Sequence, residues 1–245
     1  MRPFLILQLR PETEASDSEF NAILAQSGLE KKDVHRIRLD QNPLISHLKL
    51  DDYSGVIVGG GPGCVSDPID KKPVIEKAIE DAVMGMMGEI ETRDFPFLGC
   101  CYGIGILAHH LGGDVSKEKY SEEVGATDCA LTAAGKNDDM LVGVATNFRA
   151  FVGHKEAVQS LPPDCVNLVR STTCPFQMIR YKSNVYATQF HPEADEKEFE
   201  LRINIYKNHG YFAPDDAEKL IEMVRAENID MPKKILRNFV EKYKN

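Results

Sequence analysis

The chain contains no tryptophan, no long apolar run and no excess of positive charge. Its 245 residues carry 29 lysines and arginines against 38 aspartates and glutamates, which gives a net charge of −9. A nucleic-acid-binding surface needs a basic patch, so this balance argues against a nucleic-acid partner. The apolar stretch within residues 1–10 is too short for a membrane span or a signal peptide, and it lacks a small-residue cleavage site. We therefore expect a cytoplasmic protein that does not associate with membranes.

The cysteines are scattered along the chain. The six residues show no C-x-x-C pair and no spacing typical of a disulfide framework or a zinc site. The sequence also lacks the Gly-x-x-x-x-Gly-Lys-[Ser/Thr] loop that binds nucleotide phosphates. We expect reduced thiols, no metal and no cofactor. The cysteines are Cys64, Cys100, Cys101, Cys129, Cys165 and Cys174.

Three short apolar runs predict buried parallel strands, at Phe4–Leu9, Gly55–Val58 and Phe95–Leu98. Helical patterns lie between them, at Ser18–Gly28 and Pro73–Met87. Alternation of strands and helices at this spacing favours an α/β fold, with a mainly parallel sheet flanked by helices. Ligands of such sheets bind at the carboxyl ends of the strands.

The sequence pattern changes between Val115 and Tyr186. Short alternating segments at Thr127–Thr132, Val166–Ser171 and Gln177–Tyr181 predict a small antiparallel β section. Val185–Phe190 then returns a strand to the parallel region.

The last fifty residues are predicted to be helical, at Glu196–Lys207, Asp215–Ala226 and Pro232–Lys244. We divide the chain into a domain of residues 1–195 and a helical extension, residues 196–245, packed on the same domain. The sequence leaves open whether the extension covers the sheet, forms a homodimer or docks a partner.

Cys101 stands at the apex of Gly99-Cys100-Cys101-Tyr102-Gly103. An apolar run precedes this segment and a helical pattern follows it, which predicts a sharp strand–turn–helix elbow with glycines on both flanks. The N-terminus of the helix is expected to lower the pKa of the Cys101 thiol. Cys100, one residue off the apex, is expected to point into the sheet.

His191 and Glu193 belong to Gln189-Phe190-His191-Pro192-Glu193. If this segment is a strand, the two side chains share one face, and Glu193 can orient His191 while His191 activates Cys101. The order cysteine, histidine, glutamate differs from the order nucleophile, acid, histidine of α/β-hydrolases.

These motifs together resemble the class I glutamine amidotransferases of the Cys-His-Glu type, especially free-standing domains related to the glutaminase half of GMP synthetase. Ile57–Gly63 is similar to the family's strand and oxyanion loop, Gly99–Gly103 to its nucleophile elbow, and Gln189–Glu193 to its Gln-Phe-His-Pro-Glu signature. Gly153–Val158 resembles, more weakly, the Ser-His-Gly-Asp-x-Val segment over the substrate. The resemblance implies a flavodoxin-like fold.

The resemblance also implies an activity. Cys101 would attack the side-chain amide of glutamine and form a thioester, and the ammonia would go to a synthase on a separate chain. The backbone N–H groups of Gly61 and Tyr102 would form the oxyanion hole. Four residues would line the substrate: Gly60, Gly105, His154 and Gln189.

Two departures from the family pattern keep other functions open. Gly105 stands where glutaminases usually carry glutamine, and Lys155 and Glu156 replace the glycine and aspartate of the Ser-His-Gly-Asp segment. The missing side chain at Gly105 could leave room for a γ-glutamyl peptide or another small amide. A third hypothesis is a non-catalytic binding or regulatory subunit that keeps the elbow as scaffold.

Overall fold

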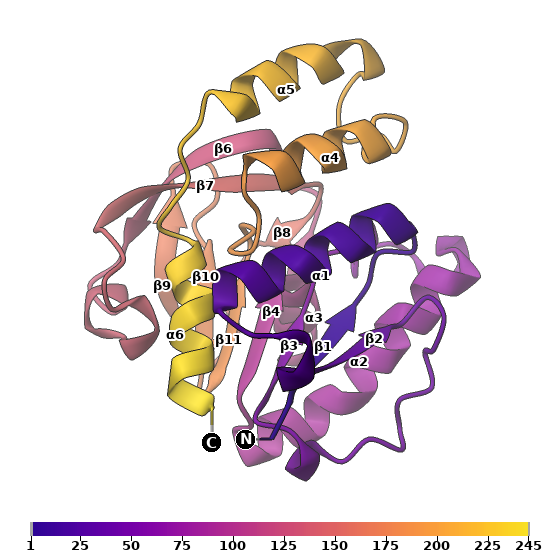
Figure 1. Ribbon diagram of the computed structural model, residues 1–245, viewed down its shortest axis with the longest axis vertical. Helices are drawn as coiled ribbons and strands as arrows, with labels where there is room; N and C mark the ends of the chain where they lie inside the picture. The colour runs from indigo at the N-terminus through magenta and orange to yellow at the C-terminus, as the bar shows by residue number, and fades with distance from the viewer. Residues whose placement is uncertain (1, 245) are drawn as a thin grey trace.

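The computed structural model describes residues 2–244, and one nine-stranded sheet runs through it (Figure 1). The strand order is β2-β1-β3-β4-β11-β10-β9-β6-β7. The first five strands in this order are parallel: β2 (Val34–Arg38), β1 (Phe4–Gln8), β3 (Gly55–Val58), β4 (Phe97–Cys100) and β11 (Val185–Thr188). The predicted mainly parallel sheet is confirmed.

The antiparallel section continues the same sheet. It consists of β10 (Met178–Tyr181), β9 (Cys165–Ser171), β6 (Glu122–Leu131) and β7 (Asn147–His154). A hairpin joins β10 to β11 through Lys182, whose φ of 49° lies in the left-handed region. A separate two-stranded sheet pairs β5 (Val115–Ser116) with β8 (Ala157–Val158).

Helices cover both faces of the parallel strands because each buried strand is apolar on both sides. On β1, Phe4 and Ile6 pack with α1 (Thr13–Ser27) and α6 (Lys233–Tyr243). Leu5 and Leu7 face the other way, toward α2 (Val74–Arg93) and α3 (Tyr102–His110). This alternation follows from the two-residue period of a strand.

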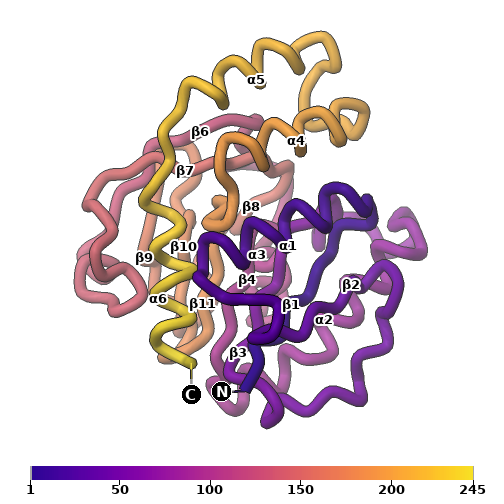
Figure 2. Tube along the Cα trace, in the orientation of Figure 1, coloured from indigo at the N-terminus to yellow at the C-terminus, as the bar shows by residue number. Residues whose placement is uncertain are grey.

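The helical extension folds back over the rest of the chain. Figure 2 follows the trace from β11 into α4 (Glu196–Tyr206) and α5 (Ala217–Arg225), which lie beside β6 and β7, and then to α6 beside α1. The ring of Phe199 on α4 stacks on Phe151 of β7 with centroids 4.5 Å apart. On α6, Phe239 packs against Phe4 with centroids 6.0 Å apart. None of the helices within residues 2–244 is long and apolar enough to span a bilayer.

One sequence expectation about the site's backbone is wrong. The segment carrying His191 and Glu193 is expected to be a strand, but β11 ends at Thr188 and the following residues form a loop. The Thr188 hydroxyl donates to the carbonyl of Phe190 at 2.9 Å, and Pro192 has no N–H to offer a sheet. The edge strand β2 and the strand β7 were not anticipated.

Candidate active site

The elbow at Cys101 has the predicted strand–turn–helix form. Between β4 and α3, Cys101 has φ 53° and ψ −92°, a conformation that costs a non-glycine residue about 1–3 kcal/mol. Its N–H donates to the carbonyl of Thr188 at 2.7 Å, which holds the turn against β11. Gly99 is needed for close packing, because a Cβ there would lie 2.9 Å from the carbonyl carbon of Gly103.

His191 and Glu193 form a buried pair despite lying in a loop. The ring nitrogen Nδ1 of His191 lies 2.8 Å from Glu193 Oε1, and both side chains are almost fully buried. A Cβ placed on Gly60 would lie 2.9 Å from His191 Cε1 and 3.6 Å from Cys101 Cβ. Gly60 therefore lies between the imidazole and the thiol, and its missing side chain lets the two approach.

Burial sets the charge state of this pair. It lowers the pKa of His191 to about 4, an effect that Glu193 opposes and that Arg202 and Arg10 reinforce. For Glu193, burial alone would raise the pKa, but His191 and Arg202 outweigh it and hold the pKa well below its usual range. The resting pair is thus a neutral imidazole and a carboxylate.

The expectation of a low pKa at Cys101 is wrong. Burial raises the pKa of the thiol to about 12, and the nearby cations Arg10 and Arg202 offset only part of this effect. Desolvation exceeds the benefit of the helix N-terminus at this closed position. Cys101 is therefore a neutral thiol in the free protein, and a base must take its proton as it reacts.

Two small cavities flank Cys101, with volumes of about 20 Å³ and 40 Å³. We name them the polar cavity and the aromatic cavity. Gly61 borders both. The polar cavity is lined by residues including Gly63, Tyr102, Gly105, His154, Glu156 and Gln189. The aromatic cavity is lined by residues including Arg10, His191, Phe199, Arg202, Tyr206 and Phe212.

The loop Gly59–Gly63 and the start of α3 supply backbone donors beside the thiol. Tyr102 is the first residue of α3, so its N–H lies among the groups without an intrahelical acceptor. The N–H of Gly60 instead donates to Glu19 Oε2 at 3.2 Å. Gly61 and Tyr102 thus stay the candidates for an oxyanion hole, and Gly60 contributes space rather than a donor.

Of the four predicted substrate residues, Gly105, His154 and Gln189 line the polar cavity, whereas Gly60 lies beside His191 and Arg10. Gln189 lines it while its N–H donates to the carbonyl of Gln177 at 2.8 Å. His154 lies 2.9 Å from the carbonyl of Glu156 through Nδ1, and 2.9 Å from a carboxylate oxygen of Glu122 through Nε2. With both nitrogens engaged, His154 is placed to shape the wall rather than to contact a ligand.

The space that Gly105 was expected to leave open is already filled. A Cβ on Gly105 would lie 3.0 Å from Glu156 Oε1 and 3.4 Å from Val65. The Glu156 carboxylate accepts the N–H groups of Val65 and Ser66 at 2.8 and 2.9 Å, so it is fixed there. Glu156, one of the residues that depart from the family pattern, therefore occupies the space beside Gly105, the other departure.

Glu122, His154 and Cys174 form a group of metal-ligand type in residues 2–244, with candidate ligand atoms within 4.8 Å of one another. The Glu122 carboxylate already accepts hydrogen bonds from four side chains, which fill its acceptor positions. These donors are His154, Ser171, Thr173 and Gln177. The group is a hydrogen-bond centre behind the polar cavity.

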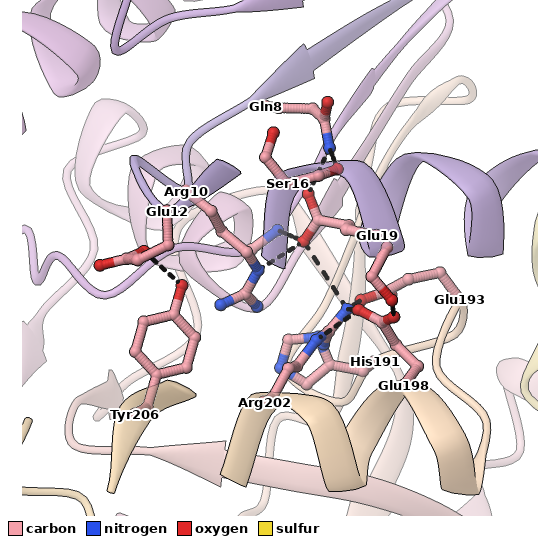
Figure 3. Close-up of polar contacts among 12 residues, drawn as sticks. Gln8, Arg10, Glu12, Ser16, Glu19, His191, Glu193, Glu198, Arg202 and Tyr206 are labelled. Atoms are coloured by element: carbon pink, nitrogen blue, oxygen red, sulfur yellow. Dashed lines mark hydrogen bonds and ion pairs between the residues drawn. The ribbon is translucent and has the colours of Figure 1, made fainter. Parts of the chain in front are cut away.

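Sequence reasoning missed the buried ion pairs around His191 (Figure 3). Arg10 donates to Glu19 at 2.8 Å, and Arg202 donates to Glu193 at 2.8 Å. Arg10 follows β1, Glu19 lies on α1 and Arg202 lies on α4, and no motif joins these three residues. Each is an ordinary charged residue in its local sequence, so the sequence carried no signal that would single them out.

Tyr211 was also missed, although it borders both cavities. Its hydroxyl lies 3.3 Å from the carbonyl of Pro62, and Lys155 Nζ sits 4.1 Å from its ring centroid. Lys155 also donates to the carbonyl of His209 at 2.8 Å. Tyr211 thus lies beside the two cavities that flank Cys101, and Lys155 contacts both its ring and the backbone of His209.

Comparison with known proteins identifies the family of this chain. Residues 14–209 match the family model described as glutamine amidotransferase class-I. The chain belongs to the class-I glutamine amidotransferase family. A glutamine-hydrolyzing GMP synthase subunit of Thermoplasma volcanium is 32% identical over 182 residues, which cover 74% of this chain and 81% of the relative. The protein of the same name from Thermoplasma acidophilum is 28% identical over 63% of this chain and 70% of its own length.

The fold of this class-I glutamine amidotransferase also occurs in solved structures. A glutamine amidotransferase from Thermotoga maritima superposes with a TM-score of 0.77 at 21% identity, covering 99% of this chain and 98% of the other. One from Methylobacillus flagellatus gives a TM-score of 0.71 at 17% identity, covering 100% and 96%. The predicted flavodoxin-like architecture is confirmed over nearly the whole chain.

Proposed function

We propose that this chain is a glutaminase that hydrolyses the side-chain amide of glutamine through a thioester on Cys101 and supplies ammonia to a separate synthase. The observation that carries the proposal is the buried His191–Glu193 pair, set across Gly60 from the thiol of a strained elbow. Family membership supports amide hydrolysis, and the relatives named as one subunit of a GMP synthase support a synthase on another chain.

In the first half of the reaction, the Cys101 sulfur attacks the amide carbon while His191 Nε2 takes the thiol proton. Glu193 holds the Nδ1 proton and stabilises the imidazolium that forms. The backbone N–H groups of Gly61 and Tyr102 receive the negative oxygen of the tetrahedral intermediate, a contribution of roughly 3–4 kcal/mol for such a donor. His191 then gives its proton to the leaving nitrogen, and ammonia departs.

In the second half, water attacks the thioester. His191 accepts a proton from the water, and the intermediate collapses to release glutamate and return the proton to the Cys101 sulfur. Each step uses the same acid–base pair, so one histidine serves both halves of the cycle. Because the Gly105 site is filled by Glu156, the structure gives no added support to a larger γ-glutamyl substrate.

The test is the release of glutamate from glutamine by the purified chain, with and without a candidate synthase. We expect Cys101→Ala to abolish turnover and Cys100→Ala to retain most of it, since Cys100 is buried in the core beneath the sheet. A glutamine-directed chloroketone should label Cys101 alone. Turnover that survives in Cys101→Ala would exclude the thioester mechanism. Wild-type protein that neither turns over nor becomes labelled would favour the non-catalytic role.

A further inference from the structure

A set of buried charged groups surrounds the His191–Glu193 pair (Figure 3), and Glu19 in this set also contacts the Gly59–Gly63 loop. Glu19, on α1, is fully buried and accepts the Gly60 N–H at 3.2 Å and Arg10 Nε at 2.8 Å. The same carboxylate oxygen lies 3.8 Å from Arg202 Nη2. Glu19 therefore contacts both the Gly59–Gly63 loop, through Gly60, and α4, through Arg202.

Arg202, on α4, meets the catalytic pair directly. Its Nη2 donates to Glu193 Oε1 at 2.8 Å, and its Nη1 lies 2.9 Å from His191 Nδ1. Its Nε donates to Glu198 at 2.9 Å, so the planar guanidinium is fixed on three sides. Among the described residues, Glu193 Oε2 has no partner, so Oε1 alone carries the bonds to the ring and to Arg202.

The contact between Arg202 and the ring has a chemical consequence. When Nδ1 carries a proton, it donates to Glu193, and Arg202 Nη1 then faces it as a cation and not as a hydrogen-bond donor. A positive charge at this distance opposes a second proton on the ring. His191 becomes a weaker base and, once it has taken the thiol proton, a stronger acid toward the leaving nitrogen.

We propose that Arg202 is a positioning residue that holds Glu193 against His191 and keeps the imidazole uncharged until Cys101 attacks, with Glu19 tying this arrangement to the Gly59–Gly63 loop. The inference rests on the proposed function, since it concerns the proton that Cys101 and His191 exchange. The charged and titratable groups around the ring are Glu193 from its own loop, Arg202 and Glu198 from α4, Arg10 after β1, Glu19 from α1 and Cys101 from the elbow.

The direct test is NMR titration of the His191 ring in full-length Cys101→Ala protein, which needs no turnover. We expect Arg202→Met to raise the titration midpoint by about one unit or more, because it removes a cation in contact with the ring. Glu19→Gln should lower the midpoint, because it removes the negative charge that partly neutralises Arg10 and Arg202, and these two cations oppose protonation of the ring. A purely structural role would not move the midpoint in opposite directions. An unchanged midpoint in both variants would overturn the proposal.

Two further variants guard against loss of folding. Arg202→Lys keeps the charge but not the planar fork, so its midpoint should stay near the parent value while kcat for glutamine falls. Arg225→Met is the matched control, because Arg225 on α5 makes an exposed two-bond pair with Glu200 of α4, away from the site. We expect it to change neither midpoint nor kcat. If Arg202→Met does not fold, a midpoint unmoved in Glu19→Gln is sufficient to reject the proposal.

Kinetics separate this inference from the proposed function. If the enzyme carrying Arg202→Met is active, the acid limb of its pH profile of kcat/KM should shift to higher pH, by the same amount as the NMR midpoint of His191. If the wild-type chain does not hydrolyse glutamine, the glutaminase proposal fails, while the titration of His191 still decides the role of Arg202. A shifted midpoint with an unshifted acid limb would show that Arg202 does not act through His191 in the reaction.

Discussion

At the scale of single residues, the neutral state of His191 links catalysis to stability. The folded protein holds His191 neutral down to a pKa of about 4, whereas the reference value is 6.5. Between these values the unfolded chain binds a proton that the folded chain excludes. Stability contributed by this group is therefore complete above pH 6.5 and falls as the pH drops toward 4.

We expect the free energy of unfolding to fall by on the order of 3 kcal/mol at pH 4 through His191, because each unit of pKa difference corresponds to about 1.4 kcal/mol. Urea unfolding of the wild type and of His191→Gln across this range measures it, and the variant should have a flatter profile. Equal slopes in wild type and His191→Gln would contradict the assignment.

Residue patterns predicted part of the site and could not predict the rest. Cys101, His191 and Glu193 stand in short motifs that follow β4 and β11, and the parallel pairing of these strands brings the motifs to one edge of the sheet. Arg202 and Glu19 meet only because α4 and α1 cross beside that edge, and nothing local in either helix encodes the crossing. The expectation of a low pKa at Cys101 was wrong for the same reason, since the burial of the thiol is a property of the assembled fold.

At the scale of elements, the buried strands were the easiest to predict. The run Gly55–Val58 matches β3 at both ends because a fully apolar segment bounded by turn residues has few alternatives. The edge strand β2 was not recognised, since its sequence Val-His-Arg-Ile-Arg is largely polar and buries little. The helix α1 begins five residues earlier than expected, at Thr13, because its first turn is mostly polar.

We expect the segment His209–Tyr211 to limit access to the thiol, because Tyr211 borders both cavities beside Cys101. Cavities of about 20 Å³ and 40 Å³ hold only a few water molecules, so we expect a ligand of the size of glutamine to displace side chains such as Tyr211. We expect Tyr211→Ala to speed alkylation of Cys101 by iodoacetamide at least about tenfold, the factor that corresponds to 1.4 kcal/mol of closure. Peptide mapping by mass spectrometry measures the rate at Cys101.

Lys155→Ala should act in the same direction, because it removes the cation that holds the segment. Tyr181 provides the control, since Lys182 Nζ lies 5.2 Å from its ring centroid in a similar pair far along the sheet, on β10. Tyr181→Ala should leave alkylation of Cys101 unchanged. Identical rates in Tyr211→Ala and wild type would show that the segment does not limit access.

At the scale of the whole molecule, we propose that residues 196–245 are part of the same folding unit as residues 1–195. The apolar face of α6 lies in one cluster with β1 and α1, and α4 brings Arg202 to the His191–Glu193 pair. Removing the extension would expose a large apolar face and leave buried carboxylates without their partner.

We therefore expect one cooperative thermal transition for the full chain by calorimetry, and no cooperative transition for residues 1–195 alone. Near-ultraviolet circular dichroism of the shortened chain, compared with the full chain, serves as an independent readout of tertiary packing. Two resolved transitions in the full chain, or a shortened chain that melts cooperatively, would establish separate domains instead.

The elbow has one more consequence, which concerns the balance between activity and robustness. At most positions glycine is less stabilising than alanine, but at Cys101 the backbone adopts a conformation that only glycine takes without strain. We expect urea titrations to give Cys101→Gly a free energy of unfolding about 1 kcal/mol larger than that of Cys101→Ala. The reverse order would mean that the turn relaxes when the thiol is removed. If the expected order holds, the strained backbone at Cys101 lowers the stability of the fold, and the proposed nucleophile is kept at a position where replacing it with glycine would make the protein more stable.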